Sequence, residues 1–254
     1  MKRNILLISL SLLCLNGFAQ ETEARTDKPS RWEFEIRAGF NIGGTSPLPL
    51  PQEIRKIESY SPTIALSVEG NVTHWLDANH TWGILTGIRW ENKGMKTQAR
   101  VKNYGMEIIG SDGNRLKGNW TGRVNTRVSH TLLTFPLLGV WQRGGFRWKA
   151  GPYFSIVTDG TFDGRVSDGY LRKDNPTGDK VNFTDGASAS YDFSDELRTL
   201  QWGILAGADW QFARHFKVYA DLNWGLSDIF HSRFRTITFA MYPIYLNIGF
   251  GYCF

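Results

Sequence analysis

Cysteine is scarce in this chain, which has two among its 254 residues, Cys14 and Cys253. Cys14 lies in an N-terminal segment that we expect to be removed, so one thiol remains. One thiol cannot form an intrachain disulfide, and thiol-based metal sites and CxxC redox motifs need more than one. Disulfide-stabilised scaffolds, thiol-based metal centres and thiol–disulfide oxidoreductases are therefore excluded.

Long apolar runs and a strong charge of one sign are also missing. Beyond residue 19, no run approaches the roughly eighteen consecutive apolar residues that predict a transmembrane helix. The mean hydropathy is −0.30, and the formal net charge of +5 is small for this length. A nucleic-acid partner is therefore not indicated.

The N-terminus has the three parts of a secretory signal peptide. Lys2 and Arg3 form a basic start, an apolar stretch follows over 5–15, and Gly17 and Ala19 are small residues before a cleavage site. The apolar stretch is too short to span the roughly 30 Å bilayer core as a helix. A lipoprotein would need a small residue where Leu13 stands. We expect residues 1–19 to be a signal peptide and 20–254 to be one domain.

Aromatic residues and glycine are abundant, at 14% aromatics with ten Trp and 27 Gly. Apolar and polar residues alternate with a period of two, which is typical of strands that are apolar on one face. Eight such segments of about ten residues occur, the length that a tilted strand needs to cross a bilayer. They cover 32–41, 63–72, 82–91, 129–141, 146–156, 200–211, 216–225 and 244–254. The fourth is apolar on both faces, so its register stays open.

The connections between these segments alternate in length. Long connections cover 44–61, 94–128, 159–198 and 228–238, whereas short ones cover about 73–80, 142–145 and 212–215. Bacterial outer-membrane barrels have short periplasmic turns and long extracellular loops. We therefore expect an all-β fold, an eight-stranded antiparallel transmembrane up-and-down β-barrel in a Gram-negative outer membrane.

Tryptophan placement favours lipid over a soluble environment. Nine of the ten Trp lie within or beside the predicted strands, where rings at the headgroup level would form aromatic girdles. They are Trp32, Trp75, Trp82, Trp90, Trp141, Trp148, Trp202, Trp210 and Trp224. The alternative is a Trp-rich soluble core, which rarely has room for so many.

The inward parity of the predicted strands carries charges of both signs. The six acids are Glu33, Glu35, Glu69, Glu91, Asp209 and Asp221, and the five bases are Arg37, Arg89, Arg147, Lys149 and Lys217. Isolated buried charges are costly, whereas opposed ones can pair. Because an eight-stranded barrel is just wide enough to be filled by side chains, we expect a salt-bridged plug and no open pore.

Catalytic groups are not evident. Ser129 with His130, and His231 with Ser232, lie toward the long connections, but neighbours on one strand point to opposite faces and cannot form a dyad. We expect no catalytic, metal or cofactor site. A lipid-modifying enzyme and a narrow channel are the alternatives.

The second and third long connections have opposite charge. Counted over 93–128 the second has a net of +6, and counted over 159–197 the third has a net of −5. Basic residues of the second are Lys93, Lys96, Arg100, Lys102, Arg115, Lys117, Arg123 and Arg127. The two connections could pair with each other, or the basic one could contact lipopolysaccharide phosphates. Asp-Gly steps at 159–160, 163–164 and 168–169 predict turns in the third connection.

The last residues, Asn247, Gly249, Tyr252 and Phe254, combine a polar residue, a glycine and two aromatics in register. This arrangement resembles the β-signal that barrel-assembly machinery recognises in its substrates. We therefore expect that machinery to be a partner during biogenesis.

Several motifs resemble the PorT-type outer-membrane β-barrel family of Bacteroidetes. The resemblance rests on 32–41, 132–140, 150–155, 201–207, 223–227 and the ending 249–254, in order along the chain. It implies a barrel and a link to type IX protein secretion, whereas most relatives have no assigned function. We expect a structural or binding role, with outer-membrane lipid, lipopolysaccharide and secretion-machine proteins as partners.

Overall fold

A computed structural model of the protein describes residues 30–109 and 113–254. The predicted signal peptide, residues 1–19, lies outside the described residues. In the part of the chain that is described, no helix is long and apolar enough to cross a membrane.

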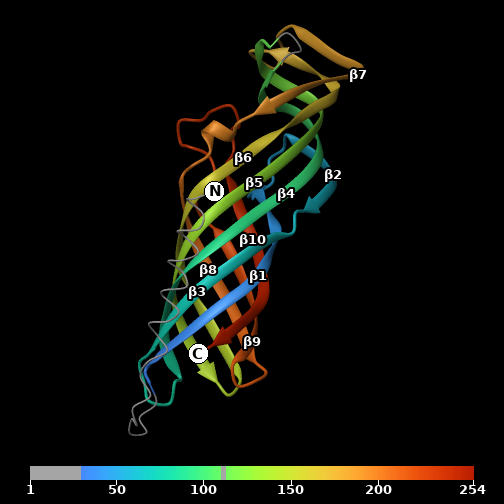
Figure 1. Ribbon diagram of the computed structural model, residues 1–254. Coiled ribbons are helices and arrows are strands. Elements are labelled where there is room, and N and C mark those ends of the chain that lie inside the picture. The colour runs from blue at the N-terminus through green and yellow to red at the C-terminus, as the bar shows by residue number, and fades with distance from the viewer. Residues whose placement is uncertain (1–29, 110–112) are drawn as a thin grey trace, which may run out of the picture. The chain divides into compact units, whose positions relative to one another are not determined.

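The described residues form ten antiparallel strands, and eight of them close into a ring (Figure 1). Pairing runs in the order β1–β3–β4–β5–β6–β8–β9–β10 and back to β1. The ring strands are β1 (Trp32–Pro47), β3 (Ala65–Trp75), β4 (Trp82–Ile109), β5 (Arg115–Arg143), β6 (Phe146–Lys173), β8 (Leu200–Gln211), β9 (Phe216–Gly225) and β10 (Met241–Cys253). The predicted eight-stranded antiparallel architecture is thus confirmed. Two further strands lie outside the ring. β2 (Ile54–Pro62) pairs with β4, and β7 (Lys180–Asp192) pairs with β6 and β4.

The three short connections lie where the sequence predicts them, whereas the predicted long connection 94–128 is mostly strand, because β4 ends at Ile109 and β5 begins at Arg115. Short turns join β3 to β4, β5 to β6 and β8 to β9, and the ring starts and ends on their side, where the Phe254 amide donates to the Phe34 carbonyl. We call this side the short-turn end. Because short turns face the periplasm in bacterial outer-membrane barrels, we expect this end to lie on the periplasmic side.

The predicted long loops are largely strands, which the sequence reading missed. β4, β5 and β6 have 28, 29 and 28 residues, so they continue far past the lipid-facing segment, and β2 and β7 add to the same sheet. The prediction of turns at the three Asp-Gly steps is wrong, because all three lie inside β6. Alternation continues through these extensions, but there the outward residues are polar. The strands were predicted from apolar residues on their outer face, so each predicted strand ended where the outward residues become polar.

The structure resolves the register of the fourth predicted strand. Leu132, Thr134, Leu138 and Val140 of β5 are buried inside the ring, and Leu137 is exposed outside. Leu138 and Val140 pack in an internal apolar cluster with Trp75, Leu85, Tyr153 and Leu205. The strand is apolar on both faces because one faces lipid and the other faces this cluster.

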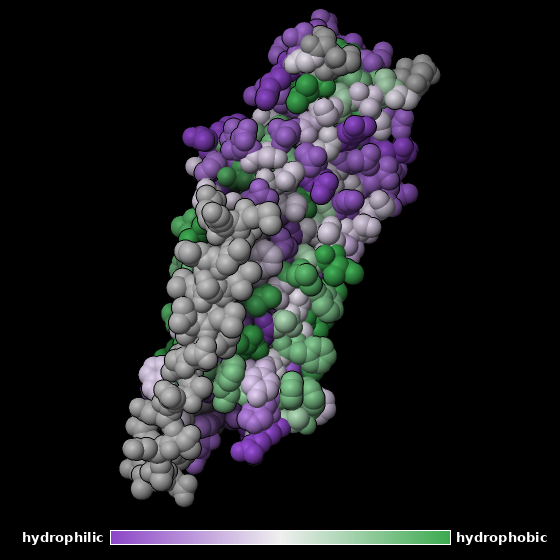
Figure 2. All heavy atoms as spheres, in the orientation of Figure 1, coloured by the Kyte–Doolittle hydropathy of each residue, from purple (hydrophilic) through white to green (hydrophobic). Residues whose placement is uncertain are grey.

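Large apolar side chains are exposed on the outer face of the ring (Figure 2). Most of the tryptophans form two belts. Trp32, Trp82, Trp148 and Trp210 lie toward the short-turn end, and Trp90, Trp202 and Trp224 lie toward the other end. On the visible face, hydrophobic residues gather over the lower strands, and hydrophilic ones over the extensions.

Trp75 does not belong to these belts, which corrects the prediction. It is fully buried inside the ring, where its indole NH donates to Glu33 and the Arg147 guanidinium lies 5.0 Å from its ring centre. Its parity is that of Glu69 and Asn71, which point inward. The prediction relied on the position of Trp75 near a strand end, whereas its parity along β3 indicates an inward side chain.

Candidate functional site

The eleven predicted lumen residues all lie inside the ring. Ten are buried, and Glu33, nearest the short-turn end, is 19% exposed. Because side chains alternate along each strand, a shift of a strand's pairing register by one residue would move its lumen side chains to the outer face. The outward apolar face therefore determines which polar residues meet inside.

Arg37 lies at the centre of this network. Its guanidinium contacts Glu35 at 2.9 Å, Asp209 at 2.8 Å and Asp221 at 3.5 Å. Lys149 also bridges Asp209 and Asp221, the latter at 2.9 Å. These contacts join β1, β6, β8 and β9 across the interior of the ring.

Two further groups extend the network along the axis. Toward the long connections, Arg89 contacts Glu69 at 2.9 Å and Asp221 at 3.1 Å. Toward the short turns, Glu33 accepts from Arg147 and Lys217, both at 2.8 Å. The ion pairs thus run through the whole lipid-facing height of the ring.

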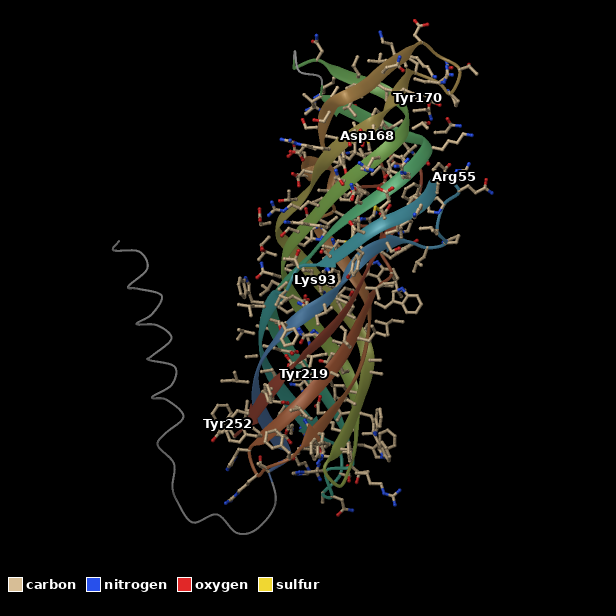
Figure 3. The ribbon with its side chains drawn as sticks, turned by 90° about the vertical axis from the view of Figure 1, so that its right-hand side faces the viewer. Arg55, Lys93, Asp168, Tyr170, Tyr219 and Tyr252 are labelled. Carbon is tan, nitrogen blue, oxygen red and sulfur yellow. The ribbon has the colours of Figure 1, made fainter. Side chains whose placement is uncertain are left out.

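Lys93 is a member that the sequence reading assigned to the basic loop. It is 3% exposed, and its ammonium lies 2.8 Å from Glu91 and over the rings of Tyr153 and Tyr245 (Figure 3). With Lys93 the network has six acids and six bases, so it is balanced in formal charge. Its parity with Arg89 and Glu91 is the signal that was missed.

Neutral polar residues complete the upper part of the lumen, and the sequence reading named only one of them. Asn247 donates to Asn41 at 2.9 Å and Ser67 at 2.7 Å, and Asn41 donates to Glu91 at 3.1 Å. Thr134 donates to Glu91 at 2.7 Å. Glu91 therefore has partners from two other strands, β1 and β5, in addition to Lys93.

The four residues of the predicted assembly signal have different surroundings. Asn247 is buried in the lumen, and Tyr252 and Phe254 are exposed on the outer face, 38% and 67%. Gly249 is opposite Gly39, and a Cβ on either glycine would collide with the Tyr219 hydroxyl. The Tyr219 ring also receives the cations of Arg37 and Lys149.

An apolar core lies beyond the charge network, inside the strand extensions. Along β4 the inward residues change from charged, Glu91 and Lys93, to apolar, Met95 and Val101. The core also contains Met106, Ile108, Trp120, Val124, Val128, Phe162, Val166, Tyr191, Phe193, Phe230 and Met241. Ions leaving the lumen on this side would therefore meet packed apolar side chains.

A cavity of about 300 Å³ opens beside this core. Its walls come from the end of β1, from β2, from β4 and from the start of β10, with a few residues of β5 and β6. The lining is mainly apolar and includes Ile54, Ile57, Met95, Tyr104 and Phe162. This volume is at the lower end of the roughly 300–1,000 Å³ typical of small-molecule sites.

Charges on the extensions pair with one another in part. Glu58 on β2 contacts Arg100 at 2.6 Å and Arg123 at 3.0 Å, and Arg123 also contacts Asp168 at 2.6 Å. The hydrogen bonds from Arg100 and Arg123 hold the pKa of the Glu58 carboxyl below its ordinary value. One ion pair, Arg123 with Asp168, joins the basic second connection to the acidic third.

The predicted nucleophile and base candidates are not assembled. His130 is buried, and its Nε2 has no hydrogen-bond partner among the described residues. His231 uses its backbone NH to donate to Glu196. Glu33, Glu35 and Cys253 lie close enough to share a metal ion, but the two carboxylates already pair with Arg37, Arg147 and Lys217.

Three solved structures illustrate the likeness to known barrels. Ail, the attachment invasion locus protein of Yersinia pestis, is 10% identical over 89% of this chain and 100% of its own, with a TM-score of 0.39. OprG from Pseudomonas aeruginosa is 15% identical over 87% and 95%, with a TM-score of 0.30. The protease OmpT from Escherichia coli is 12% identical over 92% and 100%, with a TM-score of 0.31. At these values they carry no information on activity.

No curated protein matches the sequence. A family model does, over residues 18–231, and its description is "Outer membrane protein beta-barrel domain". The match covers most of the chain, and the ring of eight strands agrees with it. The protein is therefore a member of the outer membrane protein beta-barrel domain family, with its place in the outer membrane.

Proposed function

We propose that this protein is a non-conducting, non-enzymatic outer-membrane protein that acts by binding through its strand extensions. The observation that carries the proposal is the filled lumen, in which six acids and six bases pair beneath an apolar core. Breaking a buried pair costs about 3–5 kcal/mol because it leaves an uncompensated charge. A channel would have to break several at once.

An enzymatic role finds little support in the described residues. A hydrolytic site needs a nucleophile, a base in hydrogen-bond reach and a group that orients the base. Ser129 and His130 are on opposite faces of β5, and His130 lacks an orienting partner on Nε2. Lipid A compared by mass spectrometry with and without the gene tests this point. A changed acyl pattern that His130→Ala or His231→Ala abolishes would favour the lipid-modifying enzyme.

Within the family, we propose membership of the PorT-type group of Bacteroidetes, on the motifs at 32–41, 132–140 and 249–254. This membership implies a part in type IX secretion, through protein contacts made by the extensions. If deletion of the gene leaves the secreted proteins in the medium unchanged, the secretion role fails.

The partner is either a secretion-machine protein or lipopolysaccharide, and the two differ in the forces involved. A contact between exposed lysines and phosphates weakens as salt rises, because charges are screened over roughly 8–10 Å at ordinary ionic strength. Burial of apolar residues such as Leu48 and Leu50 is hardly screened. Cross-linking in intact membranes and capture at two salt concentrations separates them.

Charge variants sharpen this experiment. Lys96→Gln and Lys102→Gln remove exposed cations from β4 in the extension, and Arg143→Gln removes one at the short-turn end. Lipopolysaccharide contact predicts several-fold weaker capture for the first two and no change for the third. Salt-resistant capture of a protein, unaffected by all three, would favour the secretion partner.

A further inference from the structure

The wall of the ring is incomplete between β1 and β2, beyond the lipid-facing segment. β3 separates β1 from β4 only as far as Ala65, which is opposite Asn41. Past that point β1 pairs with β10 alone, from Ile42 to Pro47, and β2 pairs with β4. Across this seam the Tyr60 hydroxyl donates to the Gly43 carbonyl at 2.7 Å, and behind it the Thr45 amide donates to the Met95 sulfur of β4 at 3.2 Å.

Two bulges in β2 turn its apolar residues toward the seam. In a regular strand, residues three apart point to opposite faces. Register shifts between Ile54 and Lys56 and between Ile57 and Ser59 change this. Ile54, Ile57 and Tyr60 consequently all line the cavity. Bulges re-aim side chains in this way and are frequent beside functional sites.

The cavity behind the seam is mainly apolar, and its polar lining residues are Thr45, Ser46, Thr97 and Thr126. Met95, Val101 and Tyr104 of β4 form one wall, and Phe162 and Met241 lie deeper, in the core of the extensions. In contrast, Ile57 and Tyr60 at the seam are about half exposed, 53% and 48%. An apolar recess that opens through half-exposed apolar residues suits an extended apolar ligand.

The seam adjoins the surface that faces lipid. Directly below it on β3, Leu66 is 65% exposed, and Ile64 just before the strand is 76% exposed. Leu48 and Leu50, in the connection between β1 and β2, are also exposed. The apolar outer face of the ring therefore reaches the edge of the seam, where a hydrocarbon chain can enter the cavity.

Cations surround the seam on its outer side. Lys56 and Arg55 on β2 and Lys96 on β4 are exposed, and Figure 3 shows Arg55 projecting away from the strand. The nearby Glu58 is held by Arg100 and Arg123. An anionic headgroup at this level would meet free positive charge rather than the carboxylate.

We propose that the cavity binds the acyl chain of an anionic amphiphile that enters through the seam between β1 and β2. The inference rests on the proposed binding role and names a ligand class and a site for it. Each methylene buried in such a cavity raises affinity roughly fourfold. Chain length and headgroup charge should therefore both determine binding.

Photolabelling of the full chain in phosphatidylcholine nanodiscs tests this. A sixteen-carbon fatty acid with a diazirine near its methyl end is the probe, and labelled peptides are identified by mass spectrometry. We expect label on lining residues of β2 and β4 and competition by unlabelled fatty acid. Label confined to lipid-facing residues such as Leu66 would overturn the proposal.

Matched variants identify the site. Ala99→Phe places a ring in the cavity, and its control, Gln98→Phe, adds the same ring on the opposite face of β4. We expect Ala99→Phe to reduce labelling about tenfold and Gln98→Phe to leave it unchanged. Thr97→Phe, at a second lining position, replaces Ala99→Phe if that variant fails to fold. Unchanged labelling in a folded lining variant would contradict the proposal.

Headgroup charge is tested with the alcohol of the same chain. We expect the alcohol to label several-fold less than the acid, and Lys56→Gln with Lys96→Gln to remove the difference. Equal labelling by acid and alcohol in the unaltered protein would overturn the anionic part. None of these readouts depends on conductance or on capture of a partner, so failure here leaves the proposed function to its own tests.

Discussion

Arg37 contacts more carboxylates than any other base of the described lumen network, because Glu35, Asp209 and Asp221 all contact its guanidinium. We expect Arg37→Met to destabilise the folded protein by about 3–5 kcal/mol, since it leaves three carboxylates with fewer counter-charges. Urea unfolding in liposomes measures this loss. Arg143→Met, at an exposed site in the short turn, is the control and should change stability little. Equal stability of both variants would show that the network is not stabilising.

Gly249 belongs to the predicted assembly signal, but the folded barrel also requires a glycine at this position. A Cβ there would collide with the Ala38 carbonyl and the Tyr219 hydroxyl. We expect Gly249→Ala to cost about 1–3 kcal/mol by overpacking, even when purified protein folds into liposomes without assembly machinery. Gly70→Ala, which meets open space on β3, is the matched control. If Gly249→Ala is as stable as Gly70→Ala in liposomes, this glycine acts in recognition only.

Parity made the individual lumen residues predictable. Because the period of a strand is two, an outward apolar residue identifies its neighbours as inward, and all eleven predicted charges lie inside. Lys93 was missed because it comes just after the last outward tryptophan of β4, Trp90, where the apolar pattern fades. Trp75 was misassigned because its position near a strand end outweighed its parity.

The strands of the extensions could not be predicted in the same way. Their outward residues face water, so alternation there reads as polar with occasional apolar residues, such as Met106 and Ile108 on β4. Residues of the apolar core come from distant parts of the chain, for example Phe162, Tyr191 and Phe230. The β1–β2 seam depends on bulges and on which strand β2 pairs with, and neither is visible in composition or spacing.

Protease accessibility should follow these strands rather than the predicted loops. Trypsin added to intact cells should cut at Lys173 and Lys180, which flank a turn, and at Arg233 and Arg235 between β9 and β10. It should spare Arg123, which is in the interior of β5 and paired with Glu58 and Asp168, because the ends of strands open more readily than their interiors.

Orientation is tested by the same digestion. Arg143 and Arg214, in the short turns or beside them, are exposed and should be cut only after the outer membrane is permeabilised. Cutting at these two residues in intact cells, with Lys173 and Arg233 untouched, would reverse the orientation that we assign. The mass of the fragments identifies each site.

At the scale of the whole molecule, the order of the eight ring strands and the positions of the three short turns were predictable from the sequence. The stacking inside was predictable only in part. Charges at the level of the lipid were expected, whereas the apolar core that follows them along the axis was not. The charge network closes the lumen at the height of the lipid, and the apolar core closes it inside the strand extensions.

Conductance in planar bilayers tests this sealed lumen most directly. Purified full-length protein, reconstituted alongside a porin inserted under the same conditions as a positive control, should show no steady conductance above the bare bilayer. The reason is that ions would have to displace twelve paired charges and then cross an apolar core. A large, steady open channel from the unaltered protein would contradict the account.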